Sequence, residues 1–465
     1  MQLVAYGAQD IYLTGNPQIT FFKVVYRRHT NFAMECVEQT LNGSAGNGAS
    51  VTATISRNGD LVGKMYVTSS TAGITDGDSI IDQVDVEIGG QRIDRHYKEW
   101  LQVWAELTTP DSKALAYKNM TGALSHGLNS TNTAGVNMVQ IPLQFWFNRN
   151  PGLALPLIAL QYHEVKIKMT LGSTTGTAGV KLWADYIYLD TDERRRFAQV
   201  SHEYLIEQLQ REDSSSNTSH KLNFNHPVKE LVWTSDATNS YGTAKLQLNG
   251  HDRFAAQEEE YFQLRQPIDH HTAVPGTNIP MSDAPVMVTS TEATNAVLSA
   301  ITTTHPSAAG STATVALTAL GALIFHTTVD ADLVVGDVLL LNNSESDADA
   351  AGSFSQILTV TAKTNAYTYT VNGGTATAIA AGFGSVRIIG RLQNNKSRCS
   401  QLNKKVNVYS FALKPEEHQP SGTCNFSRID NAQLMLDVAN AVTIYAVNYN
   451  VLRVMSGMGG LAYSN

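Results

Sequence analysis

Alternation of apolar and polar residues is the feature that most constrains the fold, because it recurs along much of this 465-residue chain. Successive side chains of a β-strand point to opposite faces, so alternation predicts strands with one buried face. The clearest examples are Phe32–Val37, Val84–Ile88, Val165–Met169 and Ala244–Leu248. Turn-forming pairs such as Gly89–Gly90 and Asn249–Gly250 bound the strands. Many short strands separated by turns predict an all-β protein built from sandwiches.

One segment follows the helical period instead. Its apolar residues recur three or four positions apart, and Pro110 ends the pattern. These residues are Tyr97, Trp100, Leu101, Trp104 and Leu107. A second short helix is expected over 111–118. Helices are therefore expected only as short excursions between strands.

The chain also matches itself, in three places and in the same order. Val84–Gly90 aligns with Ala244–Gly250 at an offset of 160, and Val180–Ala184 aligns with Val442–Ala446 at an offset of 262. At an offset of 264, Phe145, Phe147, Pro151 and Pro156 align with Tyr409, Phe411, Pro415 and Pro420. This order favours two copies of one β domain. We expect an N-terminal arm at 1–30 and two domains at 31–200 and 201–465.

The second copy contains an insertion, because its matched segments lie about 104 residues further apart than those of the first. Composition places the insertion at 285–390, where Ala and Thr abound and Lys363 and Arg387 are the only Lys or Arg residues. It could be a disordered loop or a small β module. Strand patterns at Val338–Leu341, Ile357–Thr361 and Tyr367–Val371 favour the module. Since exposed loop tips tolerate insertions, we expect it to project from the surface.

Motifs for catalysis or metal binding are absent from the sequence. There is no Walker A loop, no His-Glu-x-x-His and no Cys-x-x-Cys, and the three cysteines (Cys36, Cys399, Cys424) suit neither a disulfide framework nor a zinc site. On a strand, His270 and His271 would point to opposite faces. Arg194–Arg196 is expected to form a solvated turn neutralised by its acidic neighbours. We therefore expect no catalytic, cofactor-binding or metal-binding residues.

Charge and hydropathy exclude further classes. The formal net charge of −8 argues against direct binding of nucleic acid. No apolar run reaches 18 residues, and the N-terminus lacks the pattern of a signal peptide, so we expect a soluble intracellular product. Asn-x-Ser/Thr triplets occur about as often as chance predicts for this composition. The candidate glycan sites among them are Asn129, Asn217 and Asn342.

Two long stretches resemble a known family. They are Ala5–Lys23, which reads AYGAQDIYLTGNPQITFFK, and Ser410–Asn431, which contains SFALKP and QPSGTCNFSRIDN. Both are similar to the major capsid proteins of large icosahedral nucleocytoplasmic DNA viruses, particularly those that infect algae. Further similar stretches are Ile88–Asp94, Pro151–Leu157 and Val454–Tyr463. The resemblance covers nearly the whole chain except the insertion.

This resemblance implies two tandem eight-stranded jelly rolls, here with short helices in loops. The small inserted β module at 285–390 departs from the family pattern, and we expect it at the outer surface of a capsomer. It implies a structural subunit without catalytic activity, of which three copies form a pseudo-hexagonal capsomer in the virion shell. Implied partners are neighbouring capsomers, minor capsid proteins and the face of an internal membrane, with assembly in the host cytoplasm. The main alternative is a glycan-binding jelly roll, because fold alone does not fix function. The insertion could serve receptor contact or stability.

Two expectations concern particular side chains. The predicted core contains Ile88, Phe147, Ile167, Leu182, Leu248, Phe411 and Ile444. The segment Tyr12–Tyr26 is too apolar to be left exposed. It either completes the core of its own chain or packs against neighbouring subunits or minor capsid proteins. Lys23, Arg27 and Arg28 are expected to face the particle interior.

Overall fold

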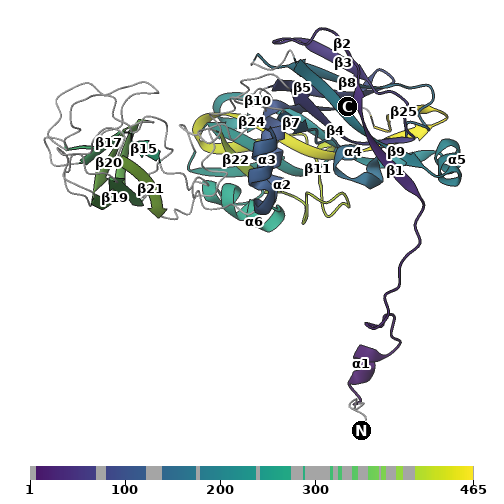
Figure 1. Cartoon of the computed structure of the whole chain (residues 1–465), viewed down its shortest axis with the longest axis horizontal. Coiled ribbons are helices and arrows are strands. Elements are labelled where there is room, and N and C mark those ends of the chain that lie inside the picture. Colours follow the sequence, from purple (N-terminus) through teal and green to yellow (C-terminus); the bar gives the residue numbers. More distant parts are fainter. Residues whose placement is uncertain are drawn as a thin grey trace.

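The computed structural model describes most of the chain, and its β-strands form four sheets. The described residues are 7–69, 80–121, 139–173, 179–236, 241–273, 286–288, 315–317, 323–326, 338–343, 354–365, 368–372, 384–390 and 404–463. Figure 1 shows two adjoining β-sandwiches, a separate small sheet and an extended N-terminal segment.

The first sandwich consists of two antiparallel sheets with strand orders β1-β9-β4-β7 and β2-β3-β8-β5-β6. Their inner faces carry the alternating apolar residues, as in β8, where every second side chain is buried. The strands are β1 (Phe32–Gln39), β2 (Leu41–Asn42), β3 (Ser50–Thr54), β4 (Leu61–Ser69), β5 (Ile81–Ile88), β6 (Gln91–Tyr97), β7 (Val139–Pro142), β8 (Val165–Leu171) and β9 (Val180–Leu189).

The second sandwich is built from one sheet that continues through both layers. Its path is β13-β12-β24-β11-β22, and β10, β14, β23 and β25 pair along it. The first part of β24 pairs with β12 and the later part with β11, whereas β10 pairs along nearly the whole of β24. The strands are β10 (His202–Lys221), β11 (Pro227–Asp236), β12 (Thr243–Leu248), β13 (His251–Asp252), β14 (Gln257–Glu258), β22 (Lys404–Ser410), β23 (Cys424–Asn425), β24 (Ala432–Met455) and β25 (Met458–Leu461).

Strand pairing agrees with the duplication. Val180 faces Ser69 across β9 and β4, and Val442 faces Ser235 across β24 and β11, so the two valines have the same partner residue type, as the offset of 262 predicts. With these two serines taken as equivalent, Pro142 of β7 and Val408 of β22 also face equivalent residues at an offset of 266. The predicted offset of 264 concerns the segment that follows β7, from Phe145 onward.

The hairpin turns repeat as well. Two-residue turns join β5 to β6 and β12 to β13. Gly89 and Gly90 have φ of +59° and +85°, and Asn249 and Gly250 have +53° and +79°. Positive φ at both positions matches the twist of the flanking strands, which is why glycine and asparagine occur there.

The predicted core residues are buried, with one exception. Ile88, Phe147, Ile167, Leu182, Leu248 and Ile444 are each at most 5% exposed, whereas Phe411 is half-buried at the margin of the second core. The core of the first sandwich also contains Ile206, Leu452 and Val454, which come from β10 and β24. The two sandwiches therefore share strands, and the division at residue 200 stays a prediction.

Strand β1 is less buried than its alternation predicts. Phe32–Cys36 are exposed on both faces, and only Gln39 is fully buried. β1 lies at the edge of its sheet, so its side chains have neighbours on one side only.

The insertion forms a seven-stranded sheet of order β15-β21-β18-β19-β20-β17-β16, so the β module is confirmed over the disordered loop. All three predicted strand patterns lie within or beside its strands, although Tyr367 is outside the described residues. The strands are β15 (Val286–Val288), β16 (Val315–Leu317), β17 (Leu323–His326), β18 (Val338–Asn343), β19 (Phe354–Asn365), β20 (Thr368–Asn372) and β21 (Gly384–Gly390). Figure 1 shows this sheet apart from the sandwiches, on the side of α6 (Gln266–His270).

The helices are short. Both predicted helices are confirmed, as α2 (Lys98–Thr108) and α3 (Asp111–Thr121). The others are α1 (Asp10–Thr14), α4 (Trp146–Arg149), α5 (Thr191–Gln199) and α6. The arginines at 194–196 lie in α5 rather than in a turn, because Asp190 caps the helix and acidic residues occupy its first turn. His270 ends α6, so the histidine pair is not on a strand.

The N-terminal segment 7–31 does not complete the core. Beyond α1 it contains a turn at 21–23 and otherwise lacks regular secondary structure, and Figure 1 shows it leading away from the sandwiches. Its large apolar side chains are at least 71% exposed, and Phe22 is 98% exposed. The alternative in which Tyr12–Tyr26 fills the core of its own chain is therefore wrong for this structure.

Candidate functional site: the junction between the two sandwiches

Helix α2 joins the two sandwiches. It follows β6 of the first sandwich, but its buried face packs on β11, β22 and β24 of the second. The ring centroid of Trp100 lies 5.2 Å from that of Tyr445, and the two tryptophans of the helix, Trp100 and Trp104, are 5.6 Å apart. The Tyr445 hydroxyl donates to Glu99 Oε2 at 2.8 Å. An apolar contact of this kind resists changes in the angle between the sandwiches.

A buried ionic cluster lies beside this helix. Glu207 of β10 accepts from Arg149 of α4 at 2.5 Å and forms an ion pair with Lys229 of β11, whose Nζ lies 2.7 Å from Glu207 Oε1. Lys229 is fully buried and Glu207 nearly so. Burial alone would raise the pKa of Glu207, but the positive charges of Arg149 and Lys229 outweigh it and lower the pKa below the ordinary value. One carboxylate therefore balances two cations that come from different sandwiches.

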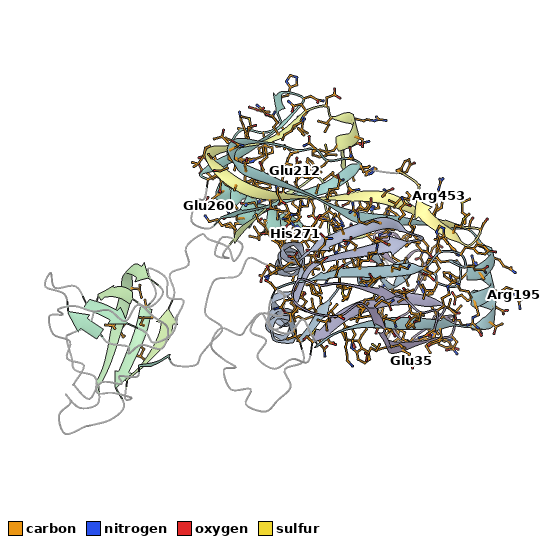
Figure 2. All side chains as sticks on the ribbon, turned by 90° about the horizontal axis from the view of Figure 1, so that it is seen from above. Glu35, Arg195, Glu212, Glu260, His271 and Arg453 are labelled. Carbon is orange, nitrogen blue, oxygen red and sulfur yellow. The ribbon has the colours of Figure 1, made fainter. Side chains whose placement is uncertain are left out.

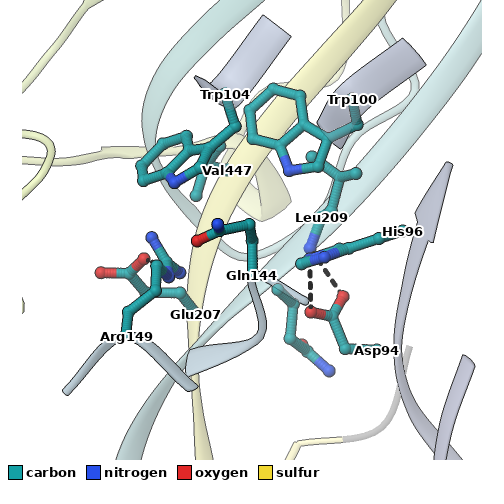
Figure 3. A pocket seen from close by; sticks show the side chains of 10 residues that line it. Asp94, His96, Trp100, Trp104, Gln144, Arg149, Glu207, Leu209 and Val447 are labelled. Atoms are coloured by element: carbon teal, nitrogen blue, oxygen red, sulfur yellow. Dashed lines mark hydrogen bonds and ion pairs between the residues drawn. The ribbon is translucent and has the colours of Figure 1, made fainter. Parts of the chain in front are cut away.

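A small cavity opens between this cluster and the tryptophans, as Figure 3 shows. Asp94 accepts from the backbone N–H of Leu209 at 3.0 Å and pairs with His96 Nε2 at 3.1 Å. The cavity volume is about 10 Å³. That is room for about one water molecule, whereas pockets for small ligands are larger by more than an order of magnitude. The cavity is part of the packing at the junction and does not accommodate a substrate or cofactor.

A buried histidine fastens the loop that follows β22. His271 lies 3.1 Å from Glu230 Oε2 of β11 and 2.9 Å from Glu416 Oε1 of the loop, and Figure 2 places it at the junction. Burial alone would lower the pKa of His271, but hydrogen bonds and charges of the two carboxylates outweigh it and raise the pKa to about 9. The imidazolium therefore links α6, β11 and this loop at neutral pH.

Stability should fall as this histidine loses its proton. The pKa of His271 in the folded chain is about 9 and that of an unfolded histidine about 6.5, so its contribution is complete below about pH 6.5 and is lost as the pH rises through 9. The difference corresponds to roughly 3 kcal/mol. We expect the midpoint of thermal unfolding to fall across this range in the wild type.

The matched variant is His271→Gln, which cannot take up the proton. It should be less stable than the wild type near neutral pH and should show little change in midpoint across the same pH range. A variant whose midpoint declines as steeply as that of the wild type would contradict the assignment to His271.

A surface groove of about 470 Å³ lies on the first sandwich, along 54–57, Leu157 and 161–165. Arg57, in its wall, donates to the carbonyl oxygens of Leu160 and Gln161 at 2.5 and 2.8 Å. His163 Nδ1, also in the wall, accepts from the backbone N–H of Gly459 at 3.1 Å and so connects β25 to the segment that precedes β8.

Gly89→Ala should destabilise the chain more than Gly90→Ala. Both glycines have positive φ, but a Cβ on Gly89 would lie 2.3 Å from His163 Nδ1, whereas a Cβ on Gly90 would meet open space. We expect losses of about 2–4 kcal/mol for Gly89→Ala and about 1–2 kcal/mol for Gly90→Ala. Denaturant unfolding of the two variants measures the difference. Equal losses in the free energy of unfolding would show that the close approach to His163 does not affect stability.

The candidate glycan sites are not brought together. Asn129 lies outside the described residues. Asn217 is exposed on β10, where it donates to Ser215 Oγ at 3.1 Å, and Asn342 lies on β18 of the inserted sheet. Modification at these residues stays a prediction.

Within the described residues, no group of three or more His, Cys, Asp or Glu side chains could hold a metal ion. In the same part of the chain, no helix is both long and apolar enough to cross a membrane. The two cysteines that can be assessed, Cys36 and Cys424, are free thiols.

Sequence reasoning missed the charged residues of the junction. Arg149, Glu207, Lys229, Glu230 and His271 come from four distant segments, so no local motif connects them. One signal was available. Lys229 and Glu230 are adjacent inside the apolar strand β11, where their side chains point to opposite faces, and two charges there indicate that both faces are covered by protein.

Comparison with known proteins gives one consistent result. Residues 20–190 match the family model "Major capsid protein N-terminus", and residues 193–242 and 398–460 match "Large eukaryotic DNA virus major capsid protein". The major capsid protein of Pyramimonas orientalis virus is 47% identical, and that of Paramecium bursaria Chlorella virus 1 is 37% identical, each over 100% of this chain and 99% of the relative. A chain of the solved PBCV-1 virus capsid (a quasi-atomic model) has 31% identity and a TM-score of 0.61, covering 96% of this chain and 100% of that one.

Proposed function

Because the chain belongs to the major capsid proteins of large eukaryotic DNA viruses, we propose that three copies assemble into a pseudo-hexagonal capsomer that tiles the virion shell. The chain is a double jelly roll and a structural protein of the capsid rather than an enzyme. Three copies of two similar sandwiches give six blocks around a threefold axis, which is the outline that a hexagonal lattice needs.

The observation that carries this proposal is the duplicated sandwich fixed at its junction. The two copies repeat the same strand register, and Val180 and Val442 occupy equivalent positions. Helix α2 and the cluster around Glu207 connect them. A subunit of a regular shell needs a constant angle between its two sandwiches. Buried packing and paired charges at the junction between the sandwiches support such rigidity.

Further parts of the proposal concern the surroundings of the capsomer. We place the domains at 31–200 and 201–465, with the module at 285–390 on the outer capsomer face, where it contributes receptor contact or stability. The inner face adjoins minor capsid proteins and an internal membrane, and capsomers form in the host cytoplasm. A particle map with the module on the inner side would contradict its placement.

Light scattering coupled to size-exclusion chromatography tests the central proposal. A capsomer subunit should elute as a stable trimer with three times the chain mass of 50.5 kDa. The glycan-binding alternative is tested in parallel on a glycan array. A monomer that binds sugars would favour that alternative and contradict the capsomer.

A further inference from the structure

The N-terminal segment exposes an unusual density of large apolar side chains. Between Ile19 and Tyr26, six of the eight residues are large and apolar, and each is at least 72% exposed. They are Ile19, Phe21, Phe22, Val24, Val25 and Tyr26. An exposed apolar run of this size marks a surface that another body covers.

The same segment concentrates positive charge. From residue 11 to residue 34 there is no Asp or Glu, whereas Lys23, Arg27 and Arg28 lie beside the aromatic residues. The whole chain carries a formal charge of −8, so this segment differs in sign from the rest. The charge indicates an anionic partner.

The distribution of the apolar residues indicates the kind of partner. Phe21 and Phe22 are neighbours in a turn, Val24 and Val25 are neighbours just after it, and all four side chains are at least 77% exposed. If the segment formed a strand at the edge of a protein sheet, the side chains of each neighbouring pair would point to opposite faces, so one of each pair would be buried and the other left in water. The interface of a lipid bilayer can surround the segment, with aromatic rings at the headgroup level and basic side chains on anionic headgroups.

We propose that Ile19–His29 is a membrane-binding segment that attaches each subunit to an anionic lipid bilayer. This deepens the proposed function, because it assigns the contact with the internal membrane to particular residues of the arm. Phe21, Phe22 and Tyr26 could stack on bases, but Ile19, Val24 and Val25 offer no stacking surface. The segment also carries only three Lys or Arg residues, so nucleic acid is the weaker match.

Flotation of the full-length protein with lipid vesicles tests the proposal. The protein should float with vesicles of phosphatidylcholine mixed with phosphatidylserine, and much less with vesicles of phosphatidylcholine alone. Each basic residue removed should weaken binding about fivefold, so Arg27→Gln/Arg28→Gln should lose on the order of 25-fold. Phe21→Ser/Phe22→Ser should also weaken binding, through loss of apolar contact with the bilayer.

The matched control is Arg195→Gln/Arg196→Gln, which removes two adjacent exposed arginines from α5. It should float like the wild type. Equal losses in this control, unchanged flotation of the arm variants, or absence of flotation with either vesicle would overturn the proposal. Tighter binding to a single-stranded oligonucleotide than to the anionic vesicles would do the same.

Chromatography of the same variants separates this proposal from the capsomer. Arm variants that remain trimeric but fail to float support a lipid partner. Arm variants that lose the trimer while the wild type does not bind vesicles would assign the arm to a second copy of the chain. A wild type that floats but is monomeric would retain the lipid contact and contradict the capsomer alone.

Discussion

Glu207→Gln is expected to lower the free energy of unfolding by about 3–5 kcal/mol, because it leaves the buried Lys229 and the partly buried Arg149 without their counterion. Both side chains pair with this carboxylate, and Lys229 has no exposed surface, whereas the Arg149 side chain is 22% exposed. An amide can accept hydrogen bonds but does not balance the charges. Thermal and denaturant unfolding measure the loss.

The control for this prediction is Glu38→Gln. Glu38 pairs with Lys181 at 3.1 Å, but the two side chains are 44% and 52% exposed, so water screens the pair and the expected loss is about 0–1 kcal/mol. Replacing Lys229 by Met in the Glu207→Gln chain should recover part of the stability, since it removes one of the unpaired charges. Similar losses for Glu207→Gln and Glu38→Gln would refute the buried-charge explanation.

Trp100→Ala is expected to cost about 3–5 kcal/mol and to weaken the coupling between the two sandwiches. The indole is 3% exposed and packs between Trp104 and Tyr445, so its removal leaves a cavity at the junction. The shared strands β10 and β24 still connect the two cores, so unfolding should become less cooperative rather than independent. Differential scanning calorimetry would then record a broader transition at a lower midpoint.

Trp183→Ala provides the comparison. Trp183 is half-buried and stacks on Tyr66 at 6.3 Å within the first sandwich, away from α2. Trp183→Ala should lower the midpoint less and leave the width of the transition unchanged. A transition in Trp100→Ala as sharp as that of the wild type would mean that α2 does not contribute to the coupling of the two sandwiches.

Local sequence patterns predicted much of the fold, because strands and turns depend on neighbouring residues. The alternation of apolar and polar residues predicted strands β5, β8 and β12. The turn-forming pairs Gly89–Gly90 and Asn249–Gly250 predicted two equivalent hairpins. The period of 3.6 located α2. These patterns express side-chain direction and backbone freedom, which do not require knowledge of the tertiary structure.

The junction could not be predicted in the same way, because its residues meet only after the chain has folded. Trp100 and Trp104 give the same pattern whether a helix packs on its own sandwich or on the other one. Glu207 and Lys229 are ordinary strand residues until β10, β11 and α4 are placed together. Likewise, the exposure of β1 follows from its position at a sheet edge rather than from its sequence.

The long strand β24 has a consequence for synthesis in the cell. Leu452 and Val454 at its end lie in the core of the first sandwich, which otherwise consists of residues translated far earlier. We therefore expect that core to stay incomplete on the ribosome until the end of β24 has emerged. A chain truncated before β24 lacks part of both cores, so we expect it to expose apolar surface and not to yield a folded subunit.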